Sequence, residues 1–282
     1  MSSLLASIWP STAALSTPAR ALPPDFGVSS RVSWQSSRLG SIDSLERVTA
    51  EVPTLKADEV VVGVRAIGLN FADIFCCLGL YEAANKMLDE GGGGGALCPG
   101  LEFSGEVQAV GSAVTRVAPG DRVFGFSRFG AYRTIVVTRD EYLRPVPSGW
   151  TFAEAASLLA QGLTAWHGLV PLGAVKKGSR VLVHSAAGGV GCAAMQICQA
   201  LGCPATGVVG SEAKAPFLRE RYPEATVVVR GPEREYAAQL AALPGGGRFD
   251  CVLDSLGGKY FSAGLESLDP MGRIVHFGAT YS

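Results

Sequence analysis

The spacing of the apolar positions changes near residue 148. From about residue 32 to residue 146, apolar residues come in short β-branched runs, for example residues 60–64 and 134–137, with turn sequences between them. Short β-branched runs bounded by turn residues are typical of strands. The first half of the chain is therefore predicted to be mostly β.

After Gly149 the apolar pattern becomes an alternation of strands and helices. Thr151, with Glu154 three residues later, forms a capping box that predicts the start of a helix. Five strands and four helices are then expected. The predicted strands are residues 180–184, 205–209, 226–230, 249–254 and 273–277, and the predicted helices are residues 190–201, 212–221, 233–242 and 259–268. Such βαβ alternation predicts an α/β fold, a doubly wound parallel sheet with helices on both faces.

These changes of pattern divide the chain into three predicted segments: residues 1–25, 26–148 and 149–282. The first contains five Ser and five Ala by residue 24, and Arg20 is its only basic residue. This composition fits a plastid or mitochondrial transit peptide, and equally an ordinary disordered terminus of a cytoplasmic protein. The run of five glycines at residues 91–95 predicts a flexible loop.

Composition excludes several classes of protein. Charged residues make up 17% of the chain and the net charge is −1, so no electrostatic field is available to hold nucleic acid or anionic lipid. No apolar run is long enough to predict an integral membrane segment. The seven cysteines contain no C-x-x-C pair and predict free thiols in a reducing compartment.

The strongest local signal is a glycine-rich turn after the strand predicted at residues 180–184. A G-x-G-x-x-G turn needs its second glycine where the backbone approaches a pyrophosphate and its third where the helix packs on the strand. Here Gly188 and Gly191 occupy these positions, and Ala186 replaces the first glycine. The predicted dinucleotide-binding residues of the turn are Ala187, Gly188, Gly189, Val190 and Gly191.

The end of the next strand predicts which dinucleotide is bound. An NAD-binding site would place an acidic residue there, but the chain has Gly210, followed by Ser211 and Lys214. A hydroxyl and a cation suit a 2′-phosphate, so NADPH is predicted over NADH. Alternatively, Ser211 is a plain N-cap and Lys214 a solvated helix charge. Arg219 and Arg230 are further candidates for the same phosphate.

Several motifs in order resemble the medium-chain dehydrogenase/reductase superfamily, and within it the zinc-free quinone oxidoreductase (zeta-crystallin-like) branch. The resemblance runs from about residue 30 to the C-terminus. It rests on Leu69-Asn70-Phe71-Ala72-Asp73, Pro99-Gly100-Leu101-Glu102, Pro119-Gly120-Asp121-Arg122-Val123, Leu163-Thr164-Ala165-Trp166 and the glycine-rich turn. It implies a GroES-like catalytic domain joined to a Rossmann domain, with hydride transfer from NADPH in the cleft between them.

The resemblance also implies roles for single residues. It places Asn70 and Thr164 near the nicotinamide, Tyr81 at the mouth of the substrate site, and Phe277 and Gly278 against the nicotinamide ring.

Two further residues have alternative interpretations. Asp254 ends a predicted strand where the fold places ligands, but an Asp here also serves as a helix cap. His184 is interpreted as a satisfied core histidine. Phe75 stands where many relatives have a Tyr, which leaves no obligatory proton donor and makes solvent a possible source.

Zinc is not expected. Zinc dehydrogenases of this superfamily have Cys and His where this chain has Asn70 and Leu101, and neither of these side chains offers the thiolate or imidazole that zinc prefers. Alcohol dehydrogenation is thereby disfavoured, and reduction of a quinone or α,β-unsaturated carbonyl remains.

The leading hypothesis is an NADPH-dependent quinone or enone reductase acting on a small molecule, with a homodimer possible. The alternatives are an enoyl-thioester reductase and a non-catalytic dinucleotide-binding protein. The resemblance implies a sixth strand beyond Ser282, so the chain is expected to be incomplete, with an edge strand at residues 273–277 that is prone to pair with another chain.

Overall fold

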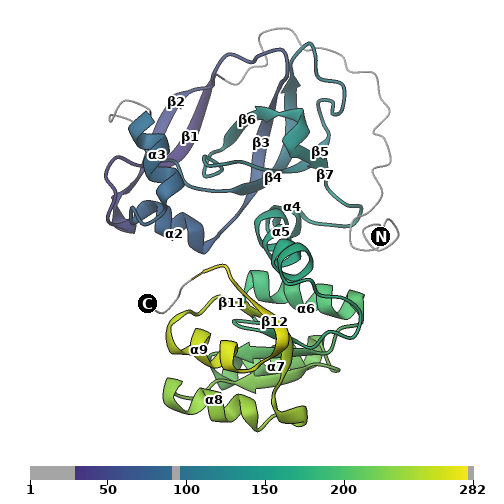
Figure 1. Ribbon diagram of the computed structural model, residues 1–282. Coiled ribbons are helices and arrows are strands. Elements are labelled where there is room, and N and C mark those ends of the chain that lie inside the picture. Colours follow the sequence, from purple (N-terminus) through teal and green to yellow (C-terminus); the bar gives the residue numbers. More distant parts are fainter. Residues whose placement is uncertain (1–28, 91–95, 279–282) are drawn as a thin grey trace. The chain divides into compact units, whose positions relative to one another are not determined.

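The computed structural model describes residues 29–90 and 96–278, which form two compact units divided between Ala160 and Gln161 (Figure 1). The predicted transit segment and the glycine run at residues 91–95 lie outside the described residues.

The first unit is built around an antiparallel sheet of five strands in the order β6-β3-β4-β5-β7. Val60, Val62, Phe103, Val107 and Val123 line its largest apolar core, and each is at most 2% exposed. The strands of this sheet are β3 (Glu59–Gly68), β4 (Glu102–Val110), β5 (Arg122–Phe126), β6 (Ile135–Arg139) and β7 (Leu143–Pro145). A separate hairpin and two helices complete the unit's larger elements, namely β1 (Ser30–Ser36), β2 (Leu45–Glu51), α2 (Phe71–Cys77) and α3 (Glu82–Glu90). The mostly β first half is therefore confirmed.

Helix α4 (Phe152–Ala156) belongs to the first unit, although it follows the predicted domain boundary. Its capping box is the one expected, because the backbone N–H of Glu154 donates to the Thr151 hydroxyl and the Thr151 N–H donates to the Glu154 carboxylate. The Phe152 carbonyl accepts a 2.5 Å hydrogen bond from Ser104 on β4. This contact joins residues 48 positions apart and ties α4 to the first unit, which extends to Ala160 within α5 (Leu159–His167).

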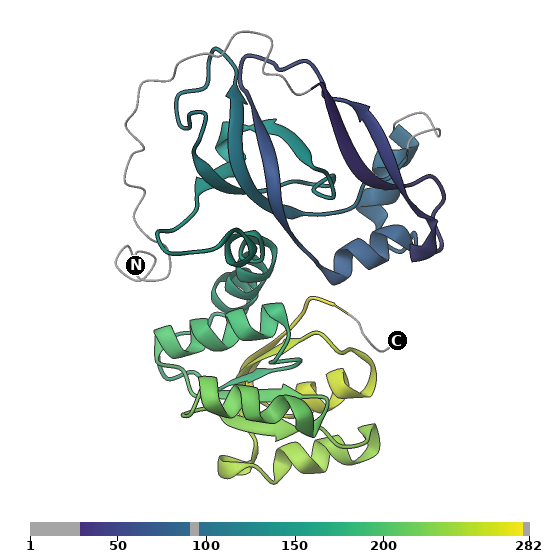
Figure 2. The same ribbon diagram turned by 180° about the vertical axis from the view of Figure 1, so that it is seen from behind.

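The second unit is a parallel sheet of five strands in the order β10-β9-β8-β11-β12, seen from the opposite side in Figure 2. The strands are β8 (Val181–Val183), β9 (Ala205–Val209), β10 (Thr226–Val229), β11 (Phe249–Asp254) and β12 (Leu268–His276). The α-helices between them are α6 (Gly189–Leu201), α7 (Ala215–Arg221), α8 (Glu233–Ala241) and α9 (Gly258–Glu266). Short 3-10 segments include η4 (Glu212–Lys214) before α7.

Both faces of this sheet are covered, as the alternating pattern predicts. Val181 and Val183 pack against α5, α6 and α7, whereas Leu182 between them packs against α8 and α9. Helices on both faces of a parallel sheet define the doubly wound architecture. The strand order reverses between β8 and β11, so the carboxyl ends of these strands form the edge at which such folds bind ligands.

The last strand differs from its prediction. It was expected at residues 273–277, but β12 begins at Leu268 and shows an irregular register opposite β11. Met271 lies within it at a φ of 68°, a left-handed conformation that an apolar side chain seldom adopts. Asp269-Pro270-Met271-Gly272 resembles a turn in sequence, and a strand containing such a bend escapes a pattern-based prediction.

The cysteines agree with the prediction of free thiols. Six of the seven are buried, and Cys192 is half-buried. Among the helices that the structure describes, none is long and apolar enough to cross a membrane.

Candidate functional site

The turn between β8 and α6 has the tight backbone that its glycines predict. Gly188 donates its N–H to the Ser185 carbonyl over 2.8 Å, and Ser185 has a φ of 51°. A Cβ atom at Gly191 would lie 2.6 Å from the Ala186 Cα and would also collide with the Ser185 carbonyl oxygen. Only glycine therefore fits at residue 191, which allows α6 to begin directly against the end of β8.

The N-terminus of α6 is open to an anionic ligand. Its N-cap is Gly188, which has no side chain to accept hydrogen bonds from the first helical turn. A Cβ atom at Gly188 would meet a single neighbour within 4 Å, the Ser185 carbonyl at 3.2 Å. Exposed N–H groups and the positive end of the helix dipole favour phosphate at such a position. Ala187, Gly189 and Val190 belong to the same turn.

The structure brings Arg230 to the end of β9. An ideal Cβ atom on Gly210 would lie 3.2 Å from a guanidinium nitrogen of Arg230, so the cation lies over this glycine. The guanidinium carbon is 4.6 Å from the centre of the Tyr260 ring, which supports the cation from α9. Arg230 thereby becomes the best-placed candidate of those expected to bind a 2′-phosphate.

Ser211 and Lys214 follow Gly210 in the chain, and both residues are exposed to solvent. Ser211 is the N-cap residue of η4, but its hydroxyl forms no capping hydrogen bond in the described structure. The Lys214 N–H donates to the Ser211 carbonyl over 3.1 Å, and the Lys214 side chain is exposed. Ser211 therefore occupies the N-cap position, as the alternative interpretation predicts, but its hydroxyl does not cap the helix.

Asp254 lies at the end of β11, is fully buried and receives four hydrogen bonds. His184 Nδ1 lies 2.5 Å from one carboxylate oxygen and His276 Nδ1 lies 2.6 Å from the other. The backbone N–H groups of Leu256 and Gly257 donate to the same two oxygens over 3.1 and 3.2 Å. Burial alone would raise the pKa of Asp254, but the hydrogen bond and electrostatic attraction of His184, with the hydrogen bonds from His276 and Leu256, outweigh it and hold the pKa below its usual value.

The structure resolves both interpretations of this cluster. His184 is a satisfied core histidine, because Tyr236 Oη lies 2.9 Å from its second ring nitrogen. Asp254 accepts from two backbone N–H groups of the turn before α9 and binds two histidines, but the N-cap residue of α9 is Gly257, so Asp254 is not a helix cap. His276 and Tyr236 were not predicted to belong to this cluster.

Phe277 and Gly278 leave the sheet directly after β12. The N–H of Phe277 donates to the Asp254 backbone carbonyl over 3.0 Å, and its ring packs partly buried on the core of the face covered by α5, α6 and α7. Thr164 lies half-buried in α5 of the same unit. The predicted residues from Ala187 to Gly191, Gly210, Arg230 and Phe277 thus lie at the carboxyl ends of β8, β9, β10 and β12.

In the first unit, Asn70 belongs to a second cluster of buried carboxyl groups. Its amide Nδ2 donates to Glu102 over 2.9 Å, and the Ala160 backbone N–H donates to the other Glu102 oxygen over 2.8 Å. Asp73 accepts from the Asn70 backbone N–H and from the Tyr132 hydroxyl. Neither carboxyl group was singled out from the sequence.

Burial raises the pKa of both Glu102 and Asp73, although their hydrogen bonds act in the opposite direction. A raised pKa in the folded state means that ionisation destabilises the fold, so this contribution becomes less favourable as pH rises above the unfolded value, about 4. We expect Glu102→Gln to gain stability relative to the wild type between about pH 4 and pH 8. Urea unfolding across this range measures the difference, and a Gln variant whose relative stability fell with pH would contradict the burial argument.

Tyr81 lies directly before α3 and contacts Phe129 edge-on, with ring centres 6.2 Å apart. It belongs to a stretch of exposed apolar side chains at and around α2, in which Leu69, Phe71 and Leu80 are each 68–69% exposed. A concentration of exposed apolar surface is typical of a contact or ligand region. This stretch was not predicted from the sequence pattern beyond Tyr81 itself.

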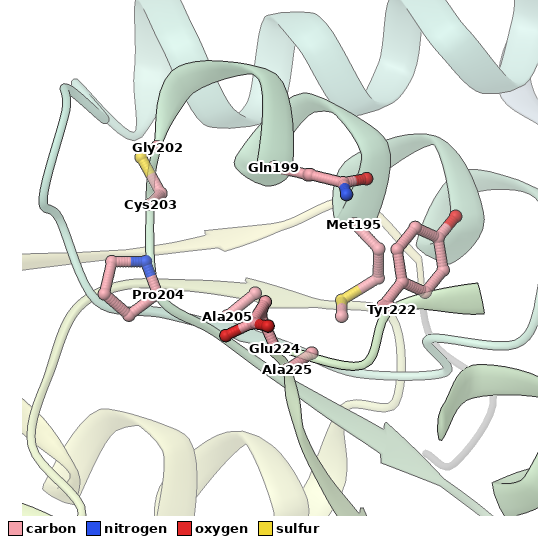
Figure 3. Close-up of a pocket in the computed structure, with 9 residues that line it drawn as sticks. All are labelled: Met195, Gln199, Gly202, Cys203, Pro204, Ala205, Tyr222, Glu224 and Ala225. Atoms are coloured by element: carbon pink, nitrogen blue, oxygen red, sulfur yellow. The ribbon is translucent and has the colours of Figure 1, made fainter. Parts of the chain in front are cut away.

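A pocket of about 370 Å³ lies at the opposite edge of the parallel sheet, beside the amino end of β9 (Figure 3). Met195 and Tyr222 form one wall, and Cys203-Pro204-Ala205 forms another. It includes none of the predicted cofactor residues. The pocket is therefore distinct from the edge that carries the glycine-rich turn.

The residues of each unit match a known family model. Residues 56–148 match the alcohol dehydrogenase GroES-like domain, and residues 189–282 match the zinc-binding dehydrogenase domain. The CurK enoyl reductase structure is 34% identical, with a TM-score of 0.80, and the match covers 89% of this chain and 74% of that one.

Other relatives show a similar level of identity to this chain. A quinone oxidoreductase structure from Pseudomonas syringae pv. Tomato DC3000 is 33% identical with a TM-score of 0.77, over 88% of this chain and 74% of that one. Mycobacterial Rv1454c, solved in complex with NADPH, is 31% identical with a TM-score of 0.77, over 88% and 74%. The polyketide synthase component PikAII of Streptomyces venezuelae is 37% identical over 86% of this chain, which corresponds to 6% of its own length.

A GroES-like unit followed by a doubly wound unit with a glycine-rich turn defines a class of two-domain dinucleotide-dependent proteins. The chain belongs to the medium-chain dehydrogenase/reductase superfamily.

Proposed function

We propose that this chain is an oxidoreductase that binds NADPH at the carboxyl ends of β8, β9, β10 and β12 and reduces a quinone or an α,β-unsaturated carbonyl without zinc. The observation that carries this proposal is the position of Arg230. Its guanidinium lies over Gly210, where an NAD-binding site would place an acidic residue. A cation there favours the 2′-phosphate that distinguishes NADPH from NADH.

The residues present fit this cofactor. Gly191 allows α6 to approach the end of β8, and Gly188 leaves space beside the N-terminus of α6 for a pyrophosphate. Arg230 and Ser211 would bind the 2′-phosphate, with Lys214 adding positive charge. The known NADPH complex of a 31% identical relative supports the same assignment.

When bound, NADPH supplies a hydride, which adds to the β-carbon of a conjugated carbonyl. The family resemblance assigns Asn70 and Thr164 to the nicotinamide side of the reaction. The Asn70 amide is held in one orientation by Glu102, which accepts its N–H. A proton must then reach the α-carbon to complete the reduction, and we assign it to solvent because Phe75 stands where many relatives have a tyrosine.

A second candidate is reduction of an enoyl thioester. It is favoured by the 34% identity to the CurK enoyl reductase and the 37% identity to a polyketide synthase component. The two reactions share the hydride step and differ in the group attached to the carbonyl carbon. The same cofactor residues therefore serve both.

A substrate panel with one acyl skeleton distinguishes the candidates. NADPH oxidation is measured with a but-2-enoyl thioester of N-acetylcysteamine, with the enal and methyl ketone of the same chain, and with benzoquinone. The proposal expects the highest kcat/KM for the quinone or the free carbonyl compounds, and the second candidate expects it for the thioester. Tight NADPH binding by calorimetry without turnover of any compound would instead indicate a non-catalytic binding protein.

Chelator treatment tests zinc independence. Asn70 and Leu101 occupy positions where zinc relatives have Cys and His, so we expect neither the unfolding midpoint nor turnover to change after dialysis against EDTA. Elemental analysis of the purified protein should find zinc well below one atom per chain. One tightly bound zinc per chain would contradict this part of the proposal.

A further inference from the structure

The carboxylate of Asp254 connects the carboxyl ends of three adjacent strands. It ends β11, and its two oxygens reach His184, which comes directly after β8, and His276, the last residue of β12. The backbone carbonyl of the same Asp254 accepts the N–H of Phe277. One residue therefore holds the end of β12 twice, through its side chain and through its backbone.

Hydrogen bonds occupy both carboxylate oxygens of Asp254 and both ring nitrogens of His184. Asp254 is fully buried and accepts from four donors, so its carboxylate has no oxygen available to a ligand. His184 is 1% exposed, and both of its ring nitrogens are hydrogen-bonded, Nδ1 to Asp254 and Nε2 to the Tyr236 hydroxyl. Asp254 therefore acts by orienting other groups.

His276 is the member of this cluster that reaches the surface. Its side chain is 41% exposed, and its ring contacts Phe261 of α9 edge-on, with ring centres 5.5 Å apart. In the described sheet, β12 pairs with β11 and stands at one end of the strand order. His276 is the last residue of β12, so its side-chain bond to Asp254 fixes the chain at the point where it leaves the sheet toward Phe277 and Gly278.

We infer that His276 is a positioning residue which, through its bond to Asp254, fixes the backbone of Phe277 and Gly278 for the nicotinamide half of the cofactor. This inference rests on the proposed function and on the family resemblance, which places Phe277 and Gly278 against the nicotinamide ring. The inference predicts that loss of the His276 bond weakens binding of the nicotinamide half of NADPH and leaves binding of the adenosine half unchanged. The adenosine half is bound by Arg230 and the turn after β9, at the other end of the sheet.

Two ligands distinguish an effect on the nicotinamide half of the cofactor from an effect on the adenosine half. NADPH carries both, whereas 2′-phospho-ADP-ribose lacks the nicotinamide. In His276→Leu, which removes the N–H donor at similar volume, we expect the Kd of NADPH to rise about tenfold while the Kd of 2′-phospho-ADP-ribose stays within about twofold of the wild type. Calorimetry gives both values without requiring turnover.

Two further variants complete the test. His276→Asn retains an N–H donor near the position of Nδ1, so it should restore most of the NADPH affinity. His167→Leu, at an exposed residue in the last turn of α5, is the matched control and should change neither Kd. Hydrogen exchange provides a readout that needs no ligand, since the Phe277 amide should exchange faster in His276→Leu than in the control.

The outcomes are distinguishable. Equal loss of affinity for both ligands would show that His276 acts only through general stability, and unchanged NADPH affinity would overturn the inference. Failure of the wild type to bind either ligand would contradict the proposed function instead, while the exchange rate of the Phe277 amide would still test the bond. If His276→Leu does not fold, the same comparisons are made with His276→Ala.

Discussion

Arg230→Ala is expected to abolish most of the preference for NADPH over NADH. The guanidinium lies over Gly210 and is supported by the Tyr260 ring, so a 2′-phosphate placed there would form a charge-assisted contact. Removing it should weaken NADPH binding by about 1.5–3 kcal/mol, roughly 10- to 150-fold in Kd. NADH, which lacks the phosphate, should bind almost as before.

Three further variants test whether this effect is specific to the guanidinium of Arg230. Arg230→Lys keeps the charge but loses the planar group that stacks on Tyr260, so it should give an intermediate Kd. Lys214→Ala should have a smaller effect that fades as salt is added, because the Lys214 side chain is exposed and screened. Arg234→Ala removes an 82% exposed cation and is the control. Equal affinity of the wild type for NADPH and NADH would contradict the assignment.

Gly191→Ala is expected to cause a large loss of stability for the addition of a single methyl group. The new Cβ would lie 2.6 Å from the Ala186 Cα and would also collide with the Ser185 carbonyl oxygen, and both of these are backbone atoms that cannot rotate away as a side chain could. We expect the free energy of unfolding to fall by on the order of 3 kcal/mol, or the second unit not to fold. Urea unfolding monitored by circular dichroism measures this change.

Gly188→Ala is the matched comparison in the same turn. Its Cβ would meet only the Ser185 carbonyl, at 3.2 Å, and the φ of −86° is open to alanine. We expect the unfolding free energy to change by less than about 1 kcal/mol, while NADPH affinity falls because the methyl group occupies the space beside the helix N-terminus. If both variants lost stability equally, the separate roles assigned to the two glycines would be wrong.

Features encoded by neighbouring residues were predictable from the sequence. The capping box of Thr151 and Glu154 and the close approach at Gly191 each depend on residues within a few positions of one another, and both are confirmed. The alternation of Val181, Leu182 and Val183 between two cores is likewise a local pattern. Four of the five parallel strands were accordingly predicted to within a residue at each end.

Features that depend on distant residues were not predictable. His184 and Asp254 are 70 positions apart, Tyr132 and Asp73 are 59 apart, and no periodic pattern relates them. Asn70 was assigned by resemblance, but its contact with Glu102 was not, because the two residues are 32 positions apart. The bond between Ser104 and Phe152, which are 48 positions apart, is a further contact of this kind.

The buried thiols have a consequence for the chemistry of the proposed substrates. Quinones and enones are electrophiles that alkylate thiolates, and a thiol reacts only to the extent that it ionises. Burial raises the pKa of all seven cysteines, to about 12 at Cys76 and Cys251. Near neutral pH these groups stay protonated, so the fold protects the protein from covalent inactivation by the compounds it is proposed to reduce.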